Sequence, residues 1–279
     1  MSEIPATLVK QLRDRTLAPF GDCKKALVET DGDIEKAIDI LRKKNSAIQA
    51  KAGSRETAEG RIGVFVDTAK GVAGLVELRC ESPPVTKADH FVALANDLAK
   101  HIAHTPVKDV EELLTQKFID GSGKTVFDRI GDVVGIIREN MKPVKMVRIE
   151  GSCGAYGHHD GSIGVVLEVE GANTHPELLR DICMHIVAKK PIALTREEVP
   201  AALIDKEREI AKEQAEVQGK GKPANIVEKI AEGKVNSWLK DNVLLDQPFV
   251  KDESKTVGEL LKAAGLKAKR FVSLRVGQV

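Results

Sequence analysis

The chain has 279 residues, of which 42% are hydrophobic and 30% are charged, and its formal net charge is +1. This composition is typical of a soluble globular protein with more than one core, and the near-neutral charge argues against an extended nucleic-acid surface. Because no apolar run is long enough to span a bilayer and the first residues lack the pattern of an export signal, we expect a cytoplasmic protein without a membrane contact.

Residues 1–52 are predicted to form a small helical unit of three short helices, similar to a ubiquitin-associated module. Leu12 belongs to an apolar stripe at helical spacing, Asp22 is placed to cap the second helix, and Asp33 is placed to cap the third. Residues 45–60 are polar and Ala-rich without a sustained apolar face, so they are predicted to form a linker.

A weak internal duplication follows. An apolar hairpin over residues 62–78 and a helix are repeated by a hairpin over residues 154–169 and a second helix. Two hairpin-plus-helix units favour an α+β core with antiparallel sheets, and residues 144–150 are expected to add a strand to the second unit. The charged and polar matches between the two copies are Glu77 with Glu168, and His101 with His185.

The rest of the chain predicts a helical hairpin and a final helix and edge strand. Two apolar stripes separated by a turn at residues 218–223 form a hairpin too thin to bury its own face, so it should pack on the core or on another copy of itself. The predicted organisation is a helical module (1–52), two core subdomains (53–143 and 144–198), an inserted helical hairpin (199–242) and a C-terminal module with the last core strand (243–279).

Catalytic and metal-binding patterns are weak. The segment 121–125, Gly-Ser-Gly-Lys-Thr, lacks the first glycine of a phosphate loop. The triplet His158-His159-Asp160 lies at a predicted hairpin turn, where its side chains are expected to be solvated rather than to bind a metal. The four cysteines form no Cys-x-x-Cys pair, and a Cys-dependent hydrolase would need a positioned base. For His101 and His185, the plainer interpretation is a role in packing. We therefore expect no covalent catalysis, no cofactor and no metal site.

The run Cys80-Glu81-Ser82-Pro83-Pro84-Val85 follows a buried strand and precedes a helical pattern. Two prolines fix φ, remove two backbone donors and end the strand, so a stiff loop is predicted between rigid elements. Such loops are where proteins tend to keep binding residues, although a plain strand terminator is also compatible with this pattern.

Several motifs in order resemble the elongation factor Ts family. They are residues 8–16, Asp22-Cys23-Lys24-Lys25-Ala26-Leu27, residues 32–37, the Cys80-Glu81 junction, Met184-His185-Ile186-Val187-Ala188, Gln247-Pro248-Phe249-Val250 and residues 254–258. The resemblance implies a guanine-nucleotide exchange factor that binds elongation factor Tu and promotes GDP release by disturbing its Mg²⁺ and phosphate site, without direct nucleic-acid binding. It also implies a dimerisation-type role for the 199–242 hairpin, and hence a homodimer as one arrangement.

The partner-binding residues implied by the resemblance lie in three places. They are Leu12, Phe20, Asp22 and Cys23 in the helical module, Ser82, Pro83, Pro84 and Val85 in the loop, and Met184 and His185 in the second core helix. Phe20 could instead fill the module's core. The family typically has Asp and Phe where this chain has Pro83 and Pro84, so the alternative is a diverged paralog that binds elongation factor Tu without efficient exchange.

Overall fold

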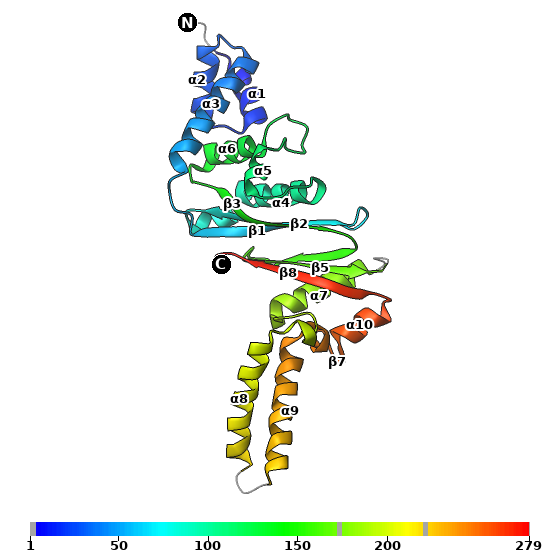
Figure 1. Ribbon diagram of the computed structural model, residues 1–279. Helices are drawn as coiled ribbons and strands as arrows, with labels where there is room; N and C mark the ends of the chain where they lie inside the picture. The colour runs from blue at the N-terminus through cyan, green and yellow to red at the C-terminus, as the bar shows by residue number, and fades with distance from the viewer. Residues whose placement is uncertain (1–3, 172–174, 220–222, 279) are drawn as a thin grey trace.

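The computed structural model describes residues 4–171, 175–219 and 223–278, and mixes helices with antiparallel strands, which confirms the α+β class (Figure 1). Residues 220–222 of the predicted turn and the first three residues of the chain lie outside the described residues. The helices are α1 (Ala6–Thr16), α2 (Phe20–Glu29), α3 (Ile34–Ala52), α4 (Asp89–His104), α5 (Val110–Thr115), α6 (Val126–Ile137), α7 (Pro176–Lys189), α8 (Ala201–Gln218), α9 (Ala224–Asn242) and α10 (Val257–Ala263). The strands are β1 (Glu59–Asp67), β2 (Val72–Cys80), β3 (Lys142–Glu150), β4 (Cys153–Gly157), β5 (Ile163–Glu170), β6 (Pro248–Phe249), β7 (Asp252–Thr256) and β8 (Lys267–Arg275).

Two three-stranded sheets pack face to face in the centre of the molecule, and helices cover their outer faces (Figure 1). The first sheet has the order β1-β2-β3 and is covered by α4, whereas the second has the order β4-β5-β8 and is covered by α7. Ile62, Leu75 and Val166 belong to the apolar layer between the sheets. α4 passes so close over β2 that a side chain at position 74 would collide with the Ala99 carbonyl oxygen, and Gly74 avoids this collision. Each sheet therefore has the other sheet against one face and a helix against its opposite face.

The strand expected in the second unit belongs to the first sheet. β3 pairs with β2 in antiparallel register, with Met146 opposite Val76, so the expectation for residues 144–150 was wrong about its neighbour. Alternating apolar residues predict that a strand exists, but they do not state which edge it joins. In the second sheet the corresponding edge is β8, as the alternation near the C-terminus predicts.

The three N-terminal helices bury their own small core, which includes Leu12, Cys23, Leu27 and Leu41. Asp33 caps α3 as predicted, because its carboxylate accepts a hydrogen bond from the Lys36 N–H at 3.1 Å. The likeness of this module to a ubiquitin-associated fold stays a prediction.

The predicted linker at residues 45–60 is wrong over its first half, because α3 continues to Ala52 and packs on α6. Gln49 faces Gly131 of α6, and Asn45 faces Gly135. A Cβ atom added at either glycine would collide with the side-chain oxygen of its partner. Glycine thus makes space for polar side chains at this interface. Ile48 and Ala52 on the same face pack in the core cluster with Ile130 of α6, so polar and apolar side chains share this contact.

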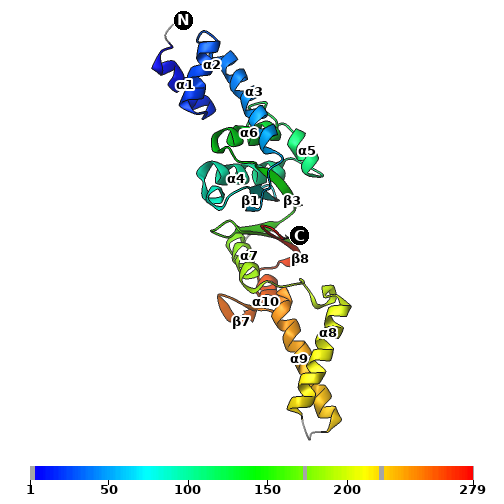
Figure 2. The same ribbon diagram turned by 90° about the vertical axis from the view of Figure 1, so that its left-hand side faces the viewer.

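The α8–α9 hairpin extends away from the layered core, so the expected packing on the core is wrong beyond its base (Figures 1 and 2). The two helices bury a narrow stripe of mostly small residues between them, including Ala211, Ala215, Ala231 and Val235. Such a stripe covers one face of each helix only. Val217, near the end of α8, has 78% of its surface exposed.

Candidate functional site

The proline loop is an ordered feature of the surface. β2 ends at Cys80, and Pro83 begins a short 3₁₀ helix, η1 (Pro83–Lys87), which leads into α4. Proline is well suited to this first position because its fixed φ matches the helix and its missing N–H has no acceptor there. Pro83 and Pro84 are exposed, whereas Val85 is buried in the core cluster beneath α4. The loop thus presents two rigid rings on an apolar anchor.

The α1–α2 connector places two apolar side chains in solvent. Leu17 and Phe20 have 53% and 51% of their surfaces exposed, so the alternative of Phe20 as a core residue is wrong. Leu12 and Cys23, which the resemblance implied as contacts, are completely buried below them. Their side chains support the connector, and a partner would not reach them in this conformation.

Asp22 does not cap α2, as the sequence predicted, because the helix already begins at Phe20. Its carboxylate instead accepts hydrogen bonds from Lys44 Nζ at 2.6 Å and from an Arg138 guanidinium nitrogen at 3.0 Å. The hydrogen bond from Lys44, helped by Arg138, lowers the pKa of Asp22 despite its partial burial. Asp22 therefore stays ionised and joins α2 to α3 and to the end of α6.

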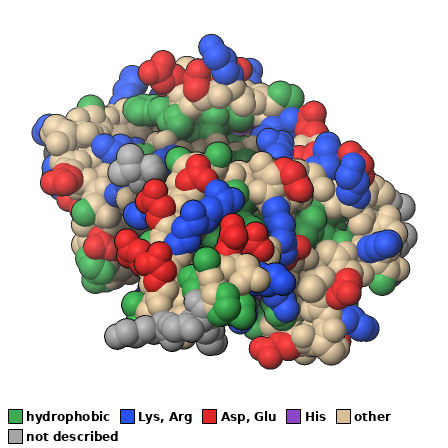
Figure 3. Space-filling model, turned by 60° about the horizontal axis from the view of Figure 1, so that its bottom comes forward, with side chains coloured by type: hydrophobic (Ala, Val, Ile, Leu, Met, Phe, Trp, Pro, Cys, Tyr) green, Lys and Arg blue, Asp and Glu red, His purple; other side chains and the backbone are tan. Residues whose placement is uncertain are grey.

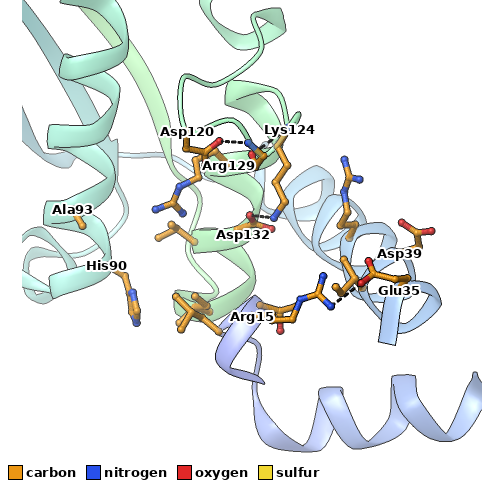
Figure 4. Close-up of a pocket in the computed structure, with 16 residues that line it drawn as sticks. Arg15, Glu35, Asp39, His90, Ala93, Asp120, Lys124, Arg129 and Asp132 are labelled. Carbon is orange, nitrogen blue, oxygen red and sulfur yellow. Dashed lines mark hydrogen bonds and ion pairs between the residues drawn. The ribbon is translucent and has the colours of Figure 1, made fainter. Parts of the chain in front are cut away.

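A groove of about 570 Å³ lies between the helical module and the core (Figure 4). Leu17 and Arg15 line it on the module side, and His90, in the first turn of α4 after the proline loop, lines it on the core side. Its charged residues include local pairs, such as Arg15 with Glu35 at 2.7 Å and Lys124 with Asp132 at 2.5 Å. Because cations and carboxylates alternate, the groove is suited to a protein surface of mixed charge rather than to a nucleotide phosphate.

The two buried histidines occupy equivalent positions in the two halves. His101 and His185 are fully buried, and each has a ring nitrogen (Nε2) 2.9 Å from a glutamine oxygen, of Gln116 and Gln247 respectively. Phe118 stacks on His101 and Phe249 on His185, which completes the correspondence. The duplication therefore extends beyond the hairpins and includes these His–Gln–Phe clusters.

His185 is neutral for a clear reason. Its Nδ1 accepts a hydrogen bond from the Val250 N–H at 3.1 Å, so Nε2 carries the proton that is donated to Gln247. Burial lowers its pKa. Met184 beside it is half-buried, and both lie on α7, on the far side of the second sheet from the proline loop (Figure 1).

The four cysteine thiols do not have the character of nucleophiles. Burial, with the Glu139 carboxylate nearby, raises the pKa of Cys80 to about 12, and burial raises that of Cys153 to about 11. Burial also raises the pKa values of Cys23 and Cys183. Because a thiolate is the reactive form, the alternative of a Cys-dependent hydrolase has no support from the structure.

The described residues were compared with the patterns of a metal site and of a membrane-spanning helix. Acidic and basic side chains are interspersed over the face shown in Figure 3. Across residues 4–171, 175–219 and 223–278, no three or more His, Cys, Asp or Glu side chains gather as they would around a metal ion. In the same part of the chain, no helix combines the length and the apolar character that crossing a bilayer requires. Thr125, in the rejected phosphate loop, caps α6 instead.

The groove does not gather the predicted site residues, because Leu17 and His90 line it and none of the predicted residues does. The connector and the start of α4 face each other across the groove, whereas Met184 and His185 lie in another layer. Sequence reasoning missed the turn at residues 138–140, which has no recognisable pattern. It also missed the second part of the duplication, although Gln116-Lys117-Phe118 before Lys124-Thr125-Val126 is repeated by Gln247-Pro248-Phe249 before Lys255-Thr256-Val257.

Comparison with known proteins gives a consistent result. A family model described as Elongation factor TS matches residues 84–278. The chain is 40% identical over 278 residues to an Elongation factor Ts of Thioalkalivibrio sulfidiphilus, covering 99% of this chain and 92% of that protein. It is 42% identical over 280 residues to an Elongation factor Ts of Azoarcus sp., covering 100% of this chain and 92% of the relative.

Proposed function

The chain belongs to the elongation factor Ts family, and from this premise we propose that it binds elongation factor Tu in the cytoplasm and promotes release of GDP. Membership places it in translation elongation. The observation that best supports the proposal is the groove between the helical module and the core, which has the exposed connector on one side and the residues that follow the proline loop on the other. A GTPase domain that touched both sides would meet Leu17 and His90 in the groove, and Phe20 and Pro83 are exposed outside its lining.

Exchange of this kind needs no covalent step. Mg²⁺ requires near-ideal octahedral coordination and bridges the phosphates of a bound nucleotide, so a small displacement of its ligands weakens nucleotide binding. A protein that binds the GTPase better in that displaced state shifts its population toward it. Reciprocity then requires that GDP weaken the binding of the exchange factor by the same factor.

We assign the residues to roles that follow their exposure. Phe20 and Leu17 make apolar contacts, and Pro83 and Pro84 form the rigid surface beside the nucleotide site. Leu12, Cys23 and Val85 support these surfaces from below. His185 holds the segment at Val250 in place through its Nδ1, so its contribution to the partner's binding is indirect.

A second candidate has one specific observation in its favour. Where the family has an acidic and an aromatic residue, this chain has Pro83 and Pro84, which can neither repel a ligand of Mg²⁺ electrostatically nor insert an aromatic wedge. A diverged paralog would bind elongation factor Tu through the same groove but would not distinguish its nucleotide-bound and nucleotide-free states. We further propose the five-unit organisation given above, with the 199–242 hairpin as the site of a homodimer.

Calorimetry separates the two candidates. The chain is titrated into elongation factor Tu from the same organism, once free of nucleotide and once saturated with GDP and Mg²⁺. An exchange factor binds the nucleotide-free form at least about tenfold more tightly, which corresponds to a coupling free energy of about 1.4 kcal/mol. Equal affinities would support the paralog, because a ligand that binds both states equally shifts neither.

A further inference from the structure

Three consecutive residues that the proposed function leaves unassigned connect the helical module to the proline loop. They form the turn between α6 and β3, residues 138–140, which we call the bracket turn (Figure 1). Between them they make hydrogen bonds to three other segments of the chain: α2, the segment after α3 and the base of the proline loop.

Glu139 binds the base of the proline loop. Its carboxylate accepts hydrogen bonds from the backbone N–H groups of Glu81 at 3.1 Å and Ser82 at 3.0 Å, and also from the Ser82 hydroxyl. Hydrogen bonds to an ionised acceptor are about twice as strong as neutral ones. Because Pro83 and Pro84 have fixed φ, fixing Ser82 also fixes the direction in which their rings project.

Asn140 also binds the base of the proline loop, and it binds the segment that follows α3 as well. Its backbone N–H donates to the Glu81 carboxylate, which also accepts from Arg55 Nε at 3.2 Å. The Asn140 side-chain amide donates to the Arg55 carbonyl oxygen at 2.7 Å. Asn140 is buried, so this exchange of hydrogen bonds is shielded from water.

Arg138 binds the helical module. Its guanidinium donates to the Asp22 carboxylate at 3.0 Å, two residues after the exposed Phe20, and its carbonyl oxygen accepts from Arg55 at 3.1 Å. Arg138 has a φ of 69°, a left-handed conformation that favours glycine, and it ends α6 there. A strained non-glycine residue that reaches another unit is compatible with a role for its side chain.

We propose that Glu139 and Arg138 are positioning residues, which hold the proline loop and the Phe20 connector in one fixed relation so that elongation factor Tu meets both at once. The proposal rests on the proposed function. Without the bracket turn, each surface would still bind, but the loop would have to be ordered during the exchange step. Small errors in the placement of groups that act together cost large factors in rate.

The test uses the full chain and the variants Glu139→Gln, Glu139→Asp and Arg138→Gly. Arg138→Gly removes the guanidinium but suits the left-handed position, so it should not lower the thermal midpoint of unfolding. The matched control is Glu198→Gln, which removes another carboxylate that accepts from a backbone N–H, that of Leu194 at 3.0 Å, at the base of the α8–α9 hairpin.

Release of fluorescent GDP from elongation factor Tu is measured by stopped flow over a range of exchange-factor concentrations. Glu139→Gln and Arg138→Gly are expected to lower the maximal rate by about tenfold with less than about twofold change in the half-saturating concentration, and Glu139→Asp should restore part of the rate. Glu198→Gln should behave as wild type. Maximal rates within about twofold of wild type for both bracket variants, with an active wild type, would overturn the positioning role.

Amide hydrogen exchange in the free protein tests the same inference without the partner. Glu139→Gln should speed exchange at the Glu81 and Ser82 amides, whereas Glu198→Gln should leave them unchanged, because only Glu139 accepts from these groups. Unchanged protection in Glu139→Gln would overturn the inference. A wild-type protein that fails to speed the release of GDP from elongation factor Tu would instead contradict the proposed function, so the two failures are distinguishable.

Discussion

Pro83 and Pro84 stand where the resemblance to elongation factor Ts implies an acidic and an aromatic residue. Their rings are exposed at the start of η1, and the residues on either side are held, Ser82 by Glu139 and Val85 by the core. The loop therefore keeps a fixed shape, although it has neither the carboxylate nor the aromatic ring that the resemblance implies. At the scale of single residues, the effect of the loop's fixed conformation can therefore be tested separately from the effect of a charged and an aromatic side chain.

Restoring the family's chemistry should increase exchange. In the double variant Pro83→Asp, Pro84→Phe, we expect the maximal rate of GDP release to rise about tenfold, because one charged contact and one aromatic contact are regained near the Mg²⁺ site. The matched control is Pro83→Ala, Pro84→Ala, which removes the rings without adding either group and should not raise the rate. Equal rates for the Asp-Phe variant and wild type would show that the loop does not act on the nucleotide site.

The buried histidines should make stability depend on pH. Burial lowers the pKa values of His185 and His101 below their ordinary value of 6.5, so the unfolded chain binds protons that the folded chain does not. Their contribution to the free energy of unfolding is therefore complete above the unfolded pKa and is lost as the pH falls through 6.5 toward the folded values. Urea titrations at about pH 7.5 and about pH 5.5 should show this loss.

The variants His185→Gln and His101→Gln identify the groups responsible. Glutamine is neutral at both pH values and can donate and accept as the imidazole does, so each variant should have a smaller difference between the two titrations. An unchanged difference in both variants would assign the pH dependence to other groups.

At the scale of elements, the contact between α3 and α6 decides where the helical module sits. Gln49 is buried against Gly131, and its side-chain amide donates to the Phe127 carbonyl oxygen at 3.3 Å. A Cβ at Gly131 would lie 2.5 Å from Gln49 Oε1, well inside van der Waals contact. The position of the module thus depends on a glycine that makes room for Gln49, in addition to the apolar contacts of Ile48 and Ala52.

Adding a methyl group tests this contact. Gly131→Ala should lower the free energy of unfolding by about 1–2 kcal/mol, since overpacking at a buried site outweighs the gain in helix propensity of about 1 kcal/mol. The matched control is Gly233→Ala in α9, where nothing lies within 4 Å of the added Cβ, so propensity alone should stabilise the helix by about 0.5–1 kcal/mol. Opposite signs are expected in guanidinium titrations. Stabilisation by Gly131→Ala would mean that the end of the Gln49 side chain moves aside at little cost.

These elements also show how far the sequence could predict the fold. Apolar periodicity predicted the three N-terminal helices, the hairpins and β8, because it reports burial directly. It could not predict that residues 45–52 continue α3, since the polar residues Asn45 and Gln49 share the packed face with Ile48 and Ala52. Nor could it predict that β3 joins the first sheet, since pairing partners are not local. The burial of Leu12 follows from its place in the apolar stripe, whereas the exposure of Phe20 and the burial of Cys23 depend on how three helices pack, which spacing alone does not determine.

At the scale of the whole molecule, two related halves stack sheet to sheet, with the module at one end and the α8–α9 hairpin at the other (Figures 1 and 2). The hairpin is inserted between α7 and Gln247. The corresponding stretch of the first half, between α4 and Gln116, holds the short helix α5 instead. The module and the proline loop therefore serve one end of the molecule, and the hairpin is free to make contacts of its own.

The hairpin should carry the homodimer. Grooves of about 310 and 480 Å³ flank Val235 on the hairpin, and Ile210 is exposed beside them. Sedimentation equilibrium should show a dimer for the full chain and a monomer when residues 201–242 are replaced by a short Gly-Ser link. A monomeric full chain would contradict the homodimer, and a dimeric deletion variant would move the interface elsewhere.

The central claim is that this chain speeds the loss of GDP from elongation factor Tu, and one stopped-flow measurement tests it most directly. Elongation factor Tu from the same organism is loaded with fluorescent GDP at fixed Mg²⁺ and mixed with excess unlabelled GDP and increasing amounts of the full chain. We predict a release rate that rises with concentration to a plateau well above the spontaneous rate. A rate that stays at the spontaneous value when calorimetry shows the complex to be saturated would contradict the account.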